Sequence, residues 1–447
     1  MRISTSQIYG AGLRNIQRNQ EQLVKLQNQI SSDRRMLTPA DDPVAAARAL
    51  TITQAKELTT QYAANQAEAS GRLGLIDSQL TSVNDLLASA RDRVIQAGNT
   101  ILSDSDRQAI ATELSARFDE LLGIANSRNA QGDYLFAGYQ SETAPFARTA
   151  AVPPATSTSV AYAGDDGQQL LQVAASQQMA TNVAGSELFM NIPEGNGSFA
   201  VSAGRAGTGA TNLGSGVVDS SSLLDPAMWR SAVNGFAWQG ASSRALQLQF
   251  STVAGVSQYQ WFDISTAAPP AAALPPVAVS APQPFTPGMA IRVATTAPPA
   301  AVATDFGAQV VVSGAPADGD AFTVRPSTQK SVFQTMQEII DLLNAPLASS
   351  SGRIEFSGEL AAHLTNLDRA IANVSRVQSS VGARMQELDA LSSNSSAVDI
   401  QYQQMLSGLQ DLDYAQAITD FTRQQVVLEA AQKSFVSISD LSLFKYI

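Results

Sequence analysis

Apolar residues recur every seven positions in two long stretches, one in each half of the chain. The first stretch follows Val44 and the second follows Gly358. A seven-residue repeat places its members along one seam of a helix, as in a coiled coil. The pattern therefore predicts two long helices that pack lengthwise into a rod. The candidate rod core consists of Leu73, Leu80, Leu87, Val94, Leu360, Leu367, Val374, Val381 and Leu388.

Two further apolar stripes lie nearer the chain ends. They consist of Ile16, Leu23 and Ile30 on one side and of Tyr414, Phe421, Leu428 and Phe435 on the other. A loop containing Pro39 separates the first stripe from the rod, and Asp42 with Pro43 is a typical helix start. A pair of short terminal helices buries little apolar surface alone, so we expect it to be ordered only when neighbours cover its other faces. These seven residues are the candidate assembly interface, and Leu428→Asp is expected to block assembly without unfolding the rod.

The middle of the chain has a different pattern. Sixteen of the nineteen prolines lie between Pro145 and Pro326, and proline interrupts helices. Short runs rich in β-branched and aromatic residues, separated by Gly, Pro, Asn and Asp, predict strands there. These runs are residues 246–250, 259–264, 290–293, 310–312 and 322–324. The proline- and alanine-rich residues 267–300 stay unassigned, since they suit a mobile loop as well as a sheet.

The patterns together predict a mainly α chain with an inserted β-rich domain. Its three parts are an inner coiled coil of the terminal helices (1–42 and 395–447), a helical rod (43–145 and 327–394) and a β-rich outer insert (146–326). Capping-box patterns at Ser103 and Ser331 start two more rod helices. Turn formers and aromatics in Gly132–Tyr139 predict a short hairpin within the rod. The register shift after Leu391 predicts a kink or stutter.

Charge and composition narrow the classes of function. The 447 residues carry a formal net charge of −11 and only 6% aromatic residues, which disfavours nucleic-acid binding. The absence of cysteine excludes disulfides and thiolate sites. No apolar run is long enough to cross a membrane, and the first residues lack the apolar segment of a secretory signal. Any export is therefore expected to use a route without a cleaved signal.

Residues suited to catalysis or metal binding are sparse. The single histidine, His363, lies on the flank of a heptad seam, where a packed or solvated side chain is expected. The glycines of Gly204–Gly209 lack the strand and helix of a nucleotide-binding loop. Three acidic pairs suit caps and turns better than a calcium loop: Asp104 with Asp106, Asp165 with Asp166, and Asp318 with Asp320. The sequence therefore predicts no catalytic, metal or cofactor site and no enzyme.

Motifs at both ends resemble the family of bacterial flagellar hook-associated protein 3. The motifs are Met1–Ser6, Pro39–Pro43, Ala47–Leu50, Tyr134–Gly138, Asp413–Ala417 and Ser442–Ile447. The resemblance covers roughly residues 1–146 and 323–447, and the middle matches only loosely. It implies a flagellin-like arrangement in which the N- and C-terminal helices pair and the insert faces outward.

The same resemblance implies a function and partners. A member of this family would form the junction between hook and filament, in a ring or helical layer of copies of itself. The implied partners are the first hook-associated protein, flagellin and an export chaperone on the C-terminal region, with no nucleic acid and no membrane. The implied location is the extracellular flagellum, reached through the flagellar type III channel. Flagellin itself and, from the heptads alone, an intracellular coiled-coil scaffold remain alternatives.

Overall fold

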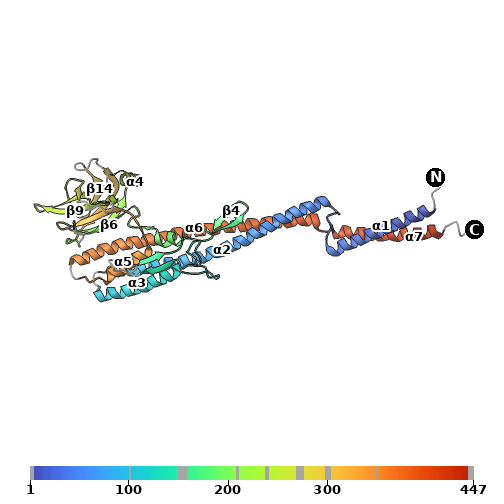
Figure 1. Cartoon of the computed structure of the whole chain (residues 1–447), viewed down its shortest axis with the longest axis horizontal. Coiled ribbons are helices and arrows are strands. Elements are labelled where there is room, and N and C mark those ends of the chain that lie inside the picture. Colours follow the sequence, from blue (N-terminus) through green and yellow to red (C-terminus); the bar gives the residue numbers. More distant parts are fainter. Residues whose placement is uncertain are drawn as a thin grey trace, which may run out of the picture. The chain divides into compact units, whose positions relative to one another are not determined.

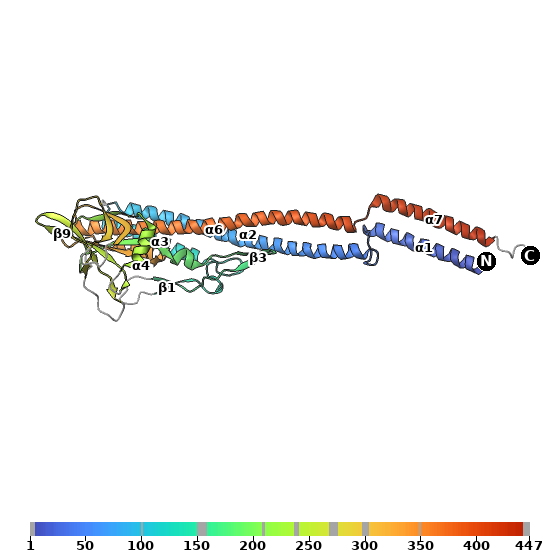
Figure 2. The same cartoon turned by 90° about the horizontal axis from the view of Figure 1, so that it is seen from above.

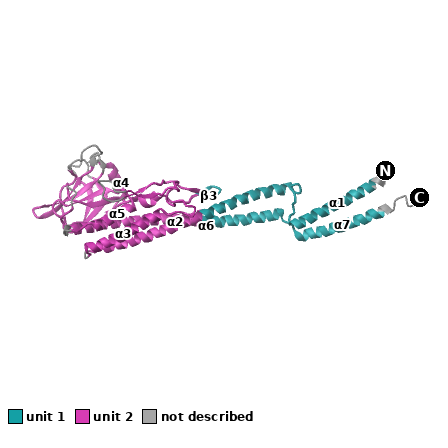
Figure 3. Cartoon of the chain, turned by 60° about the horizontal axis from the view of Figure 1, so that its bottom comes forward, with its two compact units in different colours: residues 1–68, 172–178, 387–447 teal, residues 69–171, 179–386 magenta. Residues whose placement is uncertain are grey.

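A computed structural model describes residues 5–99, 102–149, 159–207, 211–236, 241–267, 276–296, 304–347 and 350–440. The chain forms two compact units, which Figure 3 shows in different colours. Unit 1 contains residues 1–68, 172–178 and 387–447, and unit 2 contains residues 69–171 and 179–386. Both ends of the chain therefore belong to unit 1, whereas the β-rich region belongs to unit 2.

The helices of unit 1 follow the predicted pattern. Helix α1 spans Thr5–Ser32 and α7 spans Tyr414–Asp440, and the two lie side by side in Figures 1 and 2. The unit also holds the start of α2 (Pro43–Ala97) and the end of α6 (Ser350–Gln410). A side-chain oxygen of Asp42 accepts a hydrogen bond from the Ala45 amide at 3.0 Å, so the predicted start of α2 is confirmed.

The end of α6 lies beyond the predicted domain boundary at residues 394 and 395. The helix runs without interruption through the region after Leu391 and ends at Gln410, so the expected register shift after Leu391 does not end the helix. Serine and asparagine are tolerated in an exposed helix interior, so the polar sequence alone does not break the helix. The interruption between α6 and α7 is instead the short segment 411–413.

The bundle of unit 2 adds α3 (Asp104–Ala125) and α5 (Val332–Asn344) to parts of α2 and α6. Both predicted caps are present. The Asp106 amide donates to Ser103 Oγ at 3.2 Å and the Ser103 amide donates to Asp106 Oδ2 at 3.0 Å, which completes the capping box. At α5 the Gln334 amide donates to Ser331 Oγ at 2.9 Å.

Phenylalanines join the insert's first segment to this bundle. Phe189 is fully buried, and its ring centroid lies 5.7 Å from Phe136, 5.3 Å from Phe146 and 5.7 Å from Phe333. It belongs to a π-helical turn, η1 (Ser186–Met190), which the sequence pattern did not predict. The predicted hairpin at Gly132–Tyr139 is wrong, because the segment forms turns with one isolated bridge from Arg128 to Tyr134. The Asn129 side chain accepts the amides of residues 131 and 133, each at 2.9 Å, in place of a strand partner.

Two hairpins precede the β-rich lobe along the chain. The first is β1 (Phe146–Thr149) with β2 (Ser159–Tyr162), and the second is β3 (Leu170–Ala174) with β4 (Gln177–Ala180). The tip of the second hairpin, residues 172–178, belongs to unit 1. There the Gln66 side chain, 2% exposed, donates to the Val173 carbonyl at 2.7 Å. The expected insert 146–326 is therefore not a single body, since its first residues pack along the helices.

The lobe contains two antiparallel sheets around a common core. One sheet has the order β12-β10-β9-β16-β6 with β13 also paired to β10, and the other has the order β14-β15-β7. The strand bounds are β5 Ile192–Pro193, β6 Phe199–Ala203, β7 Val217–Leu223, β8 Ala241–Ser243, β9 Leu246–Val253, β10 Val256–Asp263, β11 Thr266–Ala267, β12 Val277–Ala278, β13 Gln283–Pro284, β14 Met289–Thr295, β15 Thr304–Ser313, β16 Ala321–Pro326 and β17 Gln329–Lys330.

All five predicted strand runs fall on observed strands, so this part of the prediction is confirmed. Helix α4 (Pro226–Gly235), capped by Asp225, adds the buried Trp229 to a core that also contains Trp261, Phe199 and Phe306. Of the unassigned stretch 267–300, Ala267 ends β11, residues 276–296 contain β12, β13 and β14, and residues 268–275 and 297–300 lie outside the described residues.

Candidate assembly interface

The terminal helices α1 and α7 form an antiparallel pair. The rings of Tyr9 and Phe435 meet edge to face with their centroids 5.9 Å apart. Gly12 lies directly under the same phenylalanine, and a Cβ atom at this position would come within 2.8 Å of its ring. The glycine therefore lets the two helix backbones approach closely at this contact.

Polar side chains fix the register of the pair. Gln424 of α7 donates to Gln22 Oε1 at 3.0 Å and to Asn19 Oδ1 at 3.2 Å. At the other end of α7, the Tyr414 hydroxyl donates to the Ile30 carbonyl at 3.3 Å. The ion pairs of α1 and α7 in the described chain do not cross between the two helices: Lys25 pairs with Asp41, Arg423 with Asp420, and Lys433 with Glu429. Apolar contacts and amide hydrogen bonds therefore hold the pair.

Most of the seven candidate interface residues are partly covered by the α1–α7 pair of their own chain. Ile16, Leu23, Ile30, Phe421, Leu428 and Phe435 are half-buried, while Tyr414 is 46% exposed. Phe435 and Tyr414 contact α1 directly, and Phe421 and Leu428 share their heptad spacing. The most regular apolar stripe of each helix is therefore the seam of the pair itself.

A second set of apolar side chains faces away from this seam. Its members on the terminal helices are exposed by 43 to 61% and are Leu13, Val24, Ile418, Val426, Val427 and Val436. The neighbouring parts of α2 and α6 expose more, namely Val44, Leu50, Leu58, Ile400 and Met405. Sequence reasoning missed this set because its members do not follow a seven-residue repeat. The signal that could have identified this set is the presence of apolar residues at helix positions outside the seam.

Unit 1 has hardly any core of its own. Among its described residues, the buried apolar side chains are Ala45, Ala49, Val173, Leu388 and Ala417. In contrast, all nine candidate rod-core residues, most of them in unit 2, are at most 3% exposed. An apolar surface left open in this way is typical of a site of association.

The loop between α1 and α2 lies beside the segment between α6 and α7, and backbone hydrogen bonds connect the two. Arg34 and Asp411 form an isolated antiparallel bridge, and the Arg35 amide donates to the Gln410 carbonyl at 2.8 Å. The loop then folds back on α1, where Lys25 donates to Asp41 at 2.7 Å. This hydrogen bond and those from the backbone amides of residues 37 and 38 lower the pKa of Asp41 from 3.8 to about 2.

The described residues contain no cluster of three or more His, Asp or Glu side chains that could hold a metal ion, and none of their helices is long and apolar enough to cross a membrane. His363 is largely buried, with Nδ1 3.5 Å from Glu338 Oε2. Burial lowers its pKa, which Glu338 partly opposes. A packed histidine is one of the two arrangements, packed or solvated, expected from the heptad pattern.

The two helical regions match known families. The model for the bacterial flagellin N-terminal helical region matches residues 3–141, and the model for the flagellin C-terminal helical region matches residues 364–447. Flagellar hook-associated protein 3 of Salmonella typhimurium is 34% identical over 203 residues, which is 44% of this chain and 61% of that protein. The chain thus matches about three-fifths of the length of its curated relatives.

Solved structures match over more of the chain. The flagellar junction protein FlgL of Legionella pneumophila has a TM-score of 0.62 at 28% identity, over 82% of this chain and all of that one. FlgL of Xanthomonas campestris has a TM-score of 0.62 at 26% identity, over 80% of this chain and 99% of that one. The chain is thus similar to flagellar hook-associated protein 3, and it carries flagellin-like helical regions at residues 3–141 and 364–447.

Proposed function

We propose that the protein is a structural subunit of the bacterial flagellum that joins the hook to the filament. The observation that carries this proposal is the exposed apolar surface of unit 1, which has almost no core of its own. Copies of the chain cover that surface by packing in a ring or helical layer, so burial is completed between subunits. The names of the relatives, a hook-associated protein and a junction protein, support the same role.

The partners follow from this role. The first hook-associated protein lies on one side of the layer and flagellin on the other, and an export chaperone covers the C-terminal helix before assembly. The location is extracellular, reached through the flagellar export channel without a cleaved signal. Unit 1 suits this route, because a helix pair with little core can open and close at low cost in free energy. The compared relatives do not favour flagellin as the alternative.

Substitution of Val426 by Asp tests the proposed contact between copies. Val426 is 61% exposed, so a carboxylate there disturbs neither the α1–α7 seam nor the lobe, but it would be buried in the assembled layer. We expect the variant to be exported and to stay free in the medium. Flagellin should then also be secreted as monomers instead of forming a filament. The matched control is Gln425→Asp, the adjacent exposed polar position, which should incorporate normally. Leu428→Asp is less informative, since Leu428 is half-buried in the pair and its loss would also separate α1 from α7.

Deletion of the gene tests the role itself. Cells that build hooks, secrete flagellin monomers and carry no filament would support the junction function. Filaments of normal length would overturn it. Normal incorporation of Val426→Asp, with the deletion still lacking filaments, would overturn only the assignment of this helix face.

A further inference from the structure

The chain enters and leaves the β-rich lobe at one place. It enters after β5 and leaves before β17, and these two short strands pair antiparallel, with Ile192 opposite Lys330. Both crossings lie in unit 2, beside α6. The orientation of the lobe therefore depends on the residues that surround this pair of crossings.

A buried carboxylate joins the two crossings. The side chain of Glu194 is 4% exposed, and it accepts hydrogen bonds from Thr328 Oγ1 at 2.6 Å and from Arg325 at 3.0 Å. The Glu194 carbonyl also accepts the Ser327 hydroxyl at 2.6 Å, and its amide donates to the Thr328 carbonyl at 3.1 Å. A charge buried this far is stable only while its partners stay in place, so it holds the incoming and outgoing strands together.

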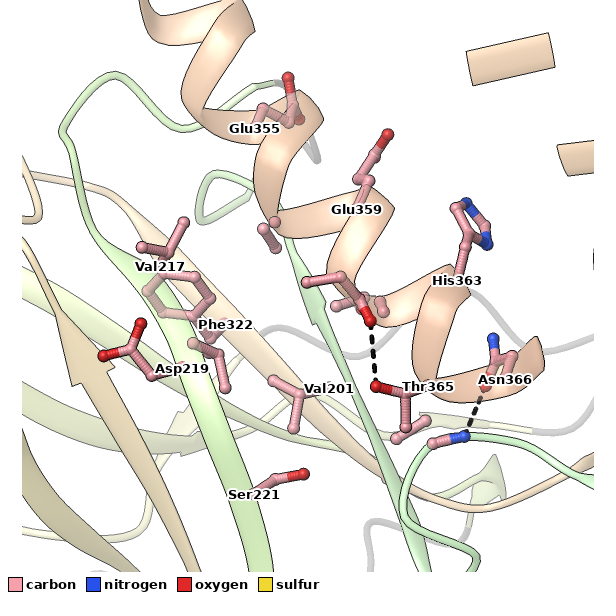
Figure 4. Close-up of a pocket in the computed structure, with 18 of the residues that line it drawn as sticks. Val201, Val217, Asp219, Ser221, Phe322, Glu355, Glu359, His363, Thr365 and Asn366 are labelled. Atoms are coloured by element: carbon pink, nitrogen blue, oxygen red, sulfur yellow. Dashed lines mark hydrogen bonds between the residues drawn. The ribbon is translucent and has the colours of Figure 1, made fainter. Parts of the chain in front are cut away.

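Two side chains of α6 form hydrogen bonds with the residues that follow Glu194. The Gly195 amide donates to Asn366 Oδ1 at 2.8 Å, which Figure 4 shows as a dashed line. Arg369, one turn further along the helix, donates to the Gly195 carbonyl at 3.3 Å and also to the Asn196 carbonyl. The crossing is thus tied to the helix through hydrogen bonds to its backbone.

Apolar packing beside these contacts is incomplete. A cavity of about 430 Å³ separates β6 and β7 from α6. Val201 and Val217 line its lobe side in Figure 4, and the helix side contains the larger Glu355 and Glu359 as well as Thr365. An added Cβ on Gly358 would lie 3.4 Å from Val217, an ordinary van der Waals contact. The lobe therefore approaches α6 closely near Gly358 and Val217, while the cavity leaves part of this face without the close packing of a filled core.

We propose that Glu194, Asn366 and Arg369 form a polar anchor that sets the orientation of the lobe on α6. The lobe folds around its own core of aromatic and aliphatic residues, so the anchor determines where the lobe points and not whether it folds. Loss of the α6 half of the anchor leaves the lobe held by its two crossings and by the packing of Val217 near Gly358, with the cavity as space into which the lobe can move.

Spin labels on a cysteine-free chain test the anchor directly. The chain has no cysteine, so Val253→Cys at the tip of the β9–β10 hairpin and Gln108→Cys on α3 give one defined pair of labels. Both positions are exposed and lie in unit 2. The distance distribution between the labels should be one narrow peak in the parent chain. The double variant Asn366→Ala/Arg369→Ala should lose that peak and give a broad distribution, and Glu194→Gln should broaden it as well.

A matched control is available on the same helix. Arg376 pairs with Glu187 at 3.0 Å but contacts neither crossing, so Arg376→Ala should keep the narrow peak. All three tryptophans lie within residues 229–261, so intrinsic fluorescence reports whether the lobe stays folded. An unchanged distance distribution in Asn366→Ala/Arg369→Ala would overturn the proposal. Loss of the native tryptophan emission in that variant would overturn it too, since the anchor would then be needed for folding.

Discussion

Asp41 shows how one exposed side chain orders the loop between α1 and α2. Its carboxylate accepts from Lys25 and from two backbone amides, and these hydrogen bonds lower its pKa from 3.8 to about 2. Because the pKa is lower in the folded chain, ionised Asp41 stabilises the loop at every pH above about 4. That contribution is lost as the pH falls from about 4 through about 2.

We expect a carboxyl-carbon NMR titration of Asp41 to give a pKa of about 2. Lys25→Met should raise that pKa toward 3.8, because it removes the largest cause of the shift. Arg35→Met is the matched control, since Arg35 lies 3.7 Å from Asp42 and forms no ion pair or hydrogen bond with Asp41 among the described residues. A value near 3.8 in the parent chain would show that the loop does not fold back on α1 in solution.

Single residues were predictable where their partners lie close in sequence. The cap at Ser103 needs only Asp106, three positions along, so the pattern contains the whole interaction. Glu194 gives no such signal, because its partners Arg325 and Thr328 lie more than 130 positions away. Its role depends on the path of the chain through the lobe, which local patterns do not encode.

At the scale of elements, strict periodicity predicted long helices and missed polar or short elements. The seven-residue repeats predicted α2 and α6, because such a repeat persists over many helical turns. Strand β7 was missed since its sequence, Val217–Leu223, contains Asp and three serines. The candidate interface was only partly predictable, because the regular stripes of α1 and α7 face each other within the chain. The apolar residues that stay exposed on α1 and α7 can be identified only when the structure shows which residues form the seam between them.

The turn between β9 and β10 is strained by its sequence. Val253 pairs with Val256, which leaves a two-residue turn in which Ala254 has φ 53° and Gly255 has φ 81°. Two positive φ angles define a type I′ turn, which prefers Asn-Gly. We expect Ala254→Asn to stabilise the lobe by about 1 kcal/mol, since Asn adopts this conformation at lower cost than Ala. Urea unfolding followed by tryptophan fluorescence measures the change.

Two further variants serve as a control and as an opposite test of this prediction. Ser251→Asn introduces the same side chain at an exposed strand position, where no gain is expected because Asn has low strand propensity. Ala254→Val should destabilise the hairpin, since β-branched residues disfavour positive φ. Equal stability of Ala254→Asn and Ala254→Val would contradict the turn geometry.

At the scale of the whole molecule, burial is unevenly distributed between the two units. Unit 2 encloses the heptad seams, the phenylalanine cluster and the lobe core, whereas unit 1 exposes much of its apolar surface. Local stability follows buried apolar contacts, so the two units should differ in how readily they open. A subunit of this kind is expected to gain order at its ends when it assembles.

Hydrogen exchange on the monomer and on the assembled protein tests this expectation. In the monomer, amides of α1 and α7 should exchange well before those of α2 around Leu80 and Leu87, because 27- and 28-residue helices with a half-buried seam open easily. Phe435→Ala, which removes the contact with Tyr9 and Gly12, should speed exchange in both terminal helices and leave tryptophan fluorescence unchanged. Assembly should slow exchange in α1 and α7 far more than around Leu80. Equal protection of α1, α7 and this part of α2 in the monomer would mean that the terminal pair is stable alone, and burial between copies would then not be what orders it.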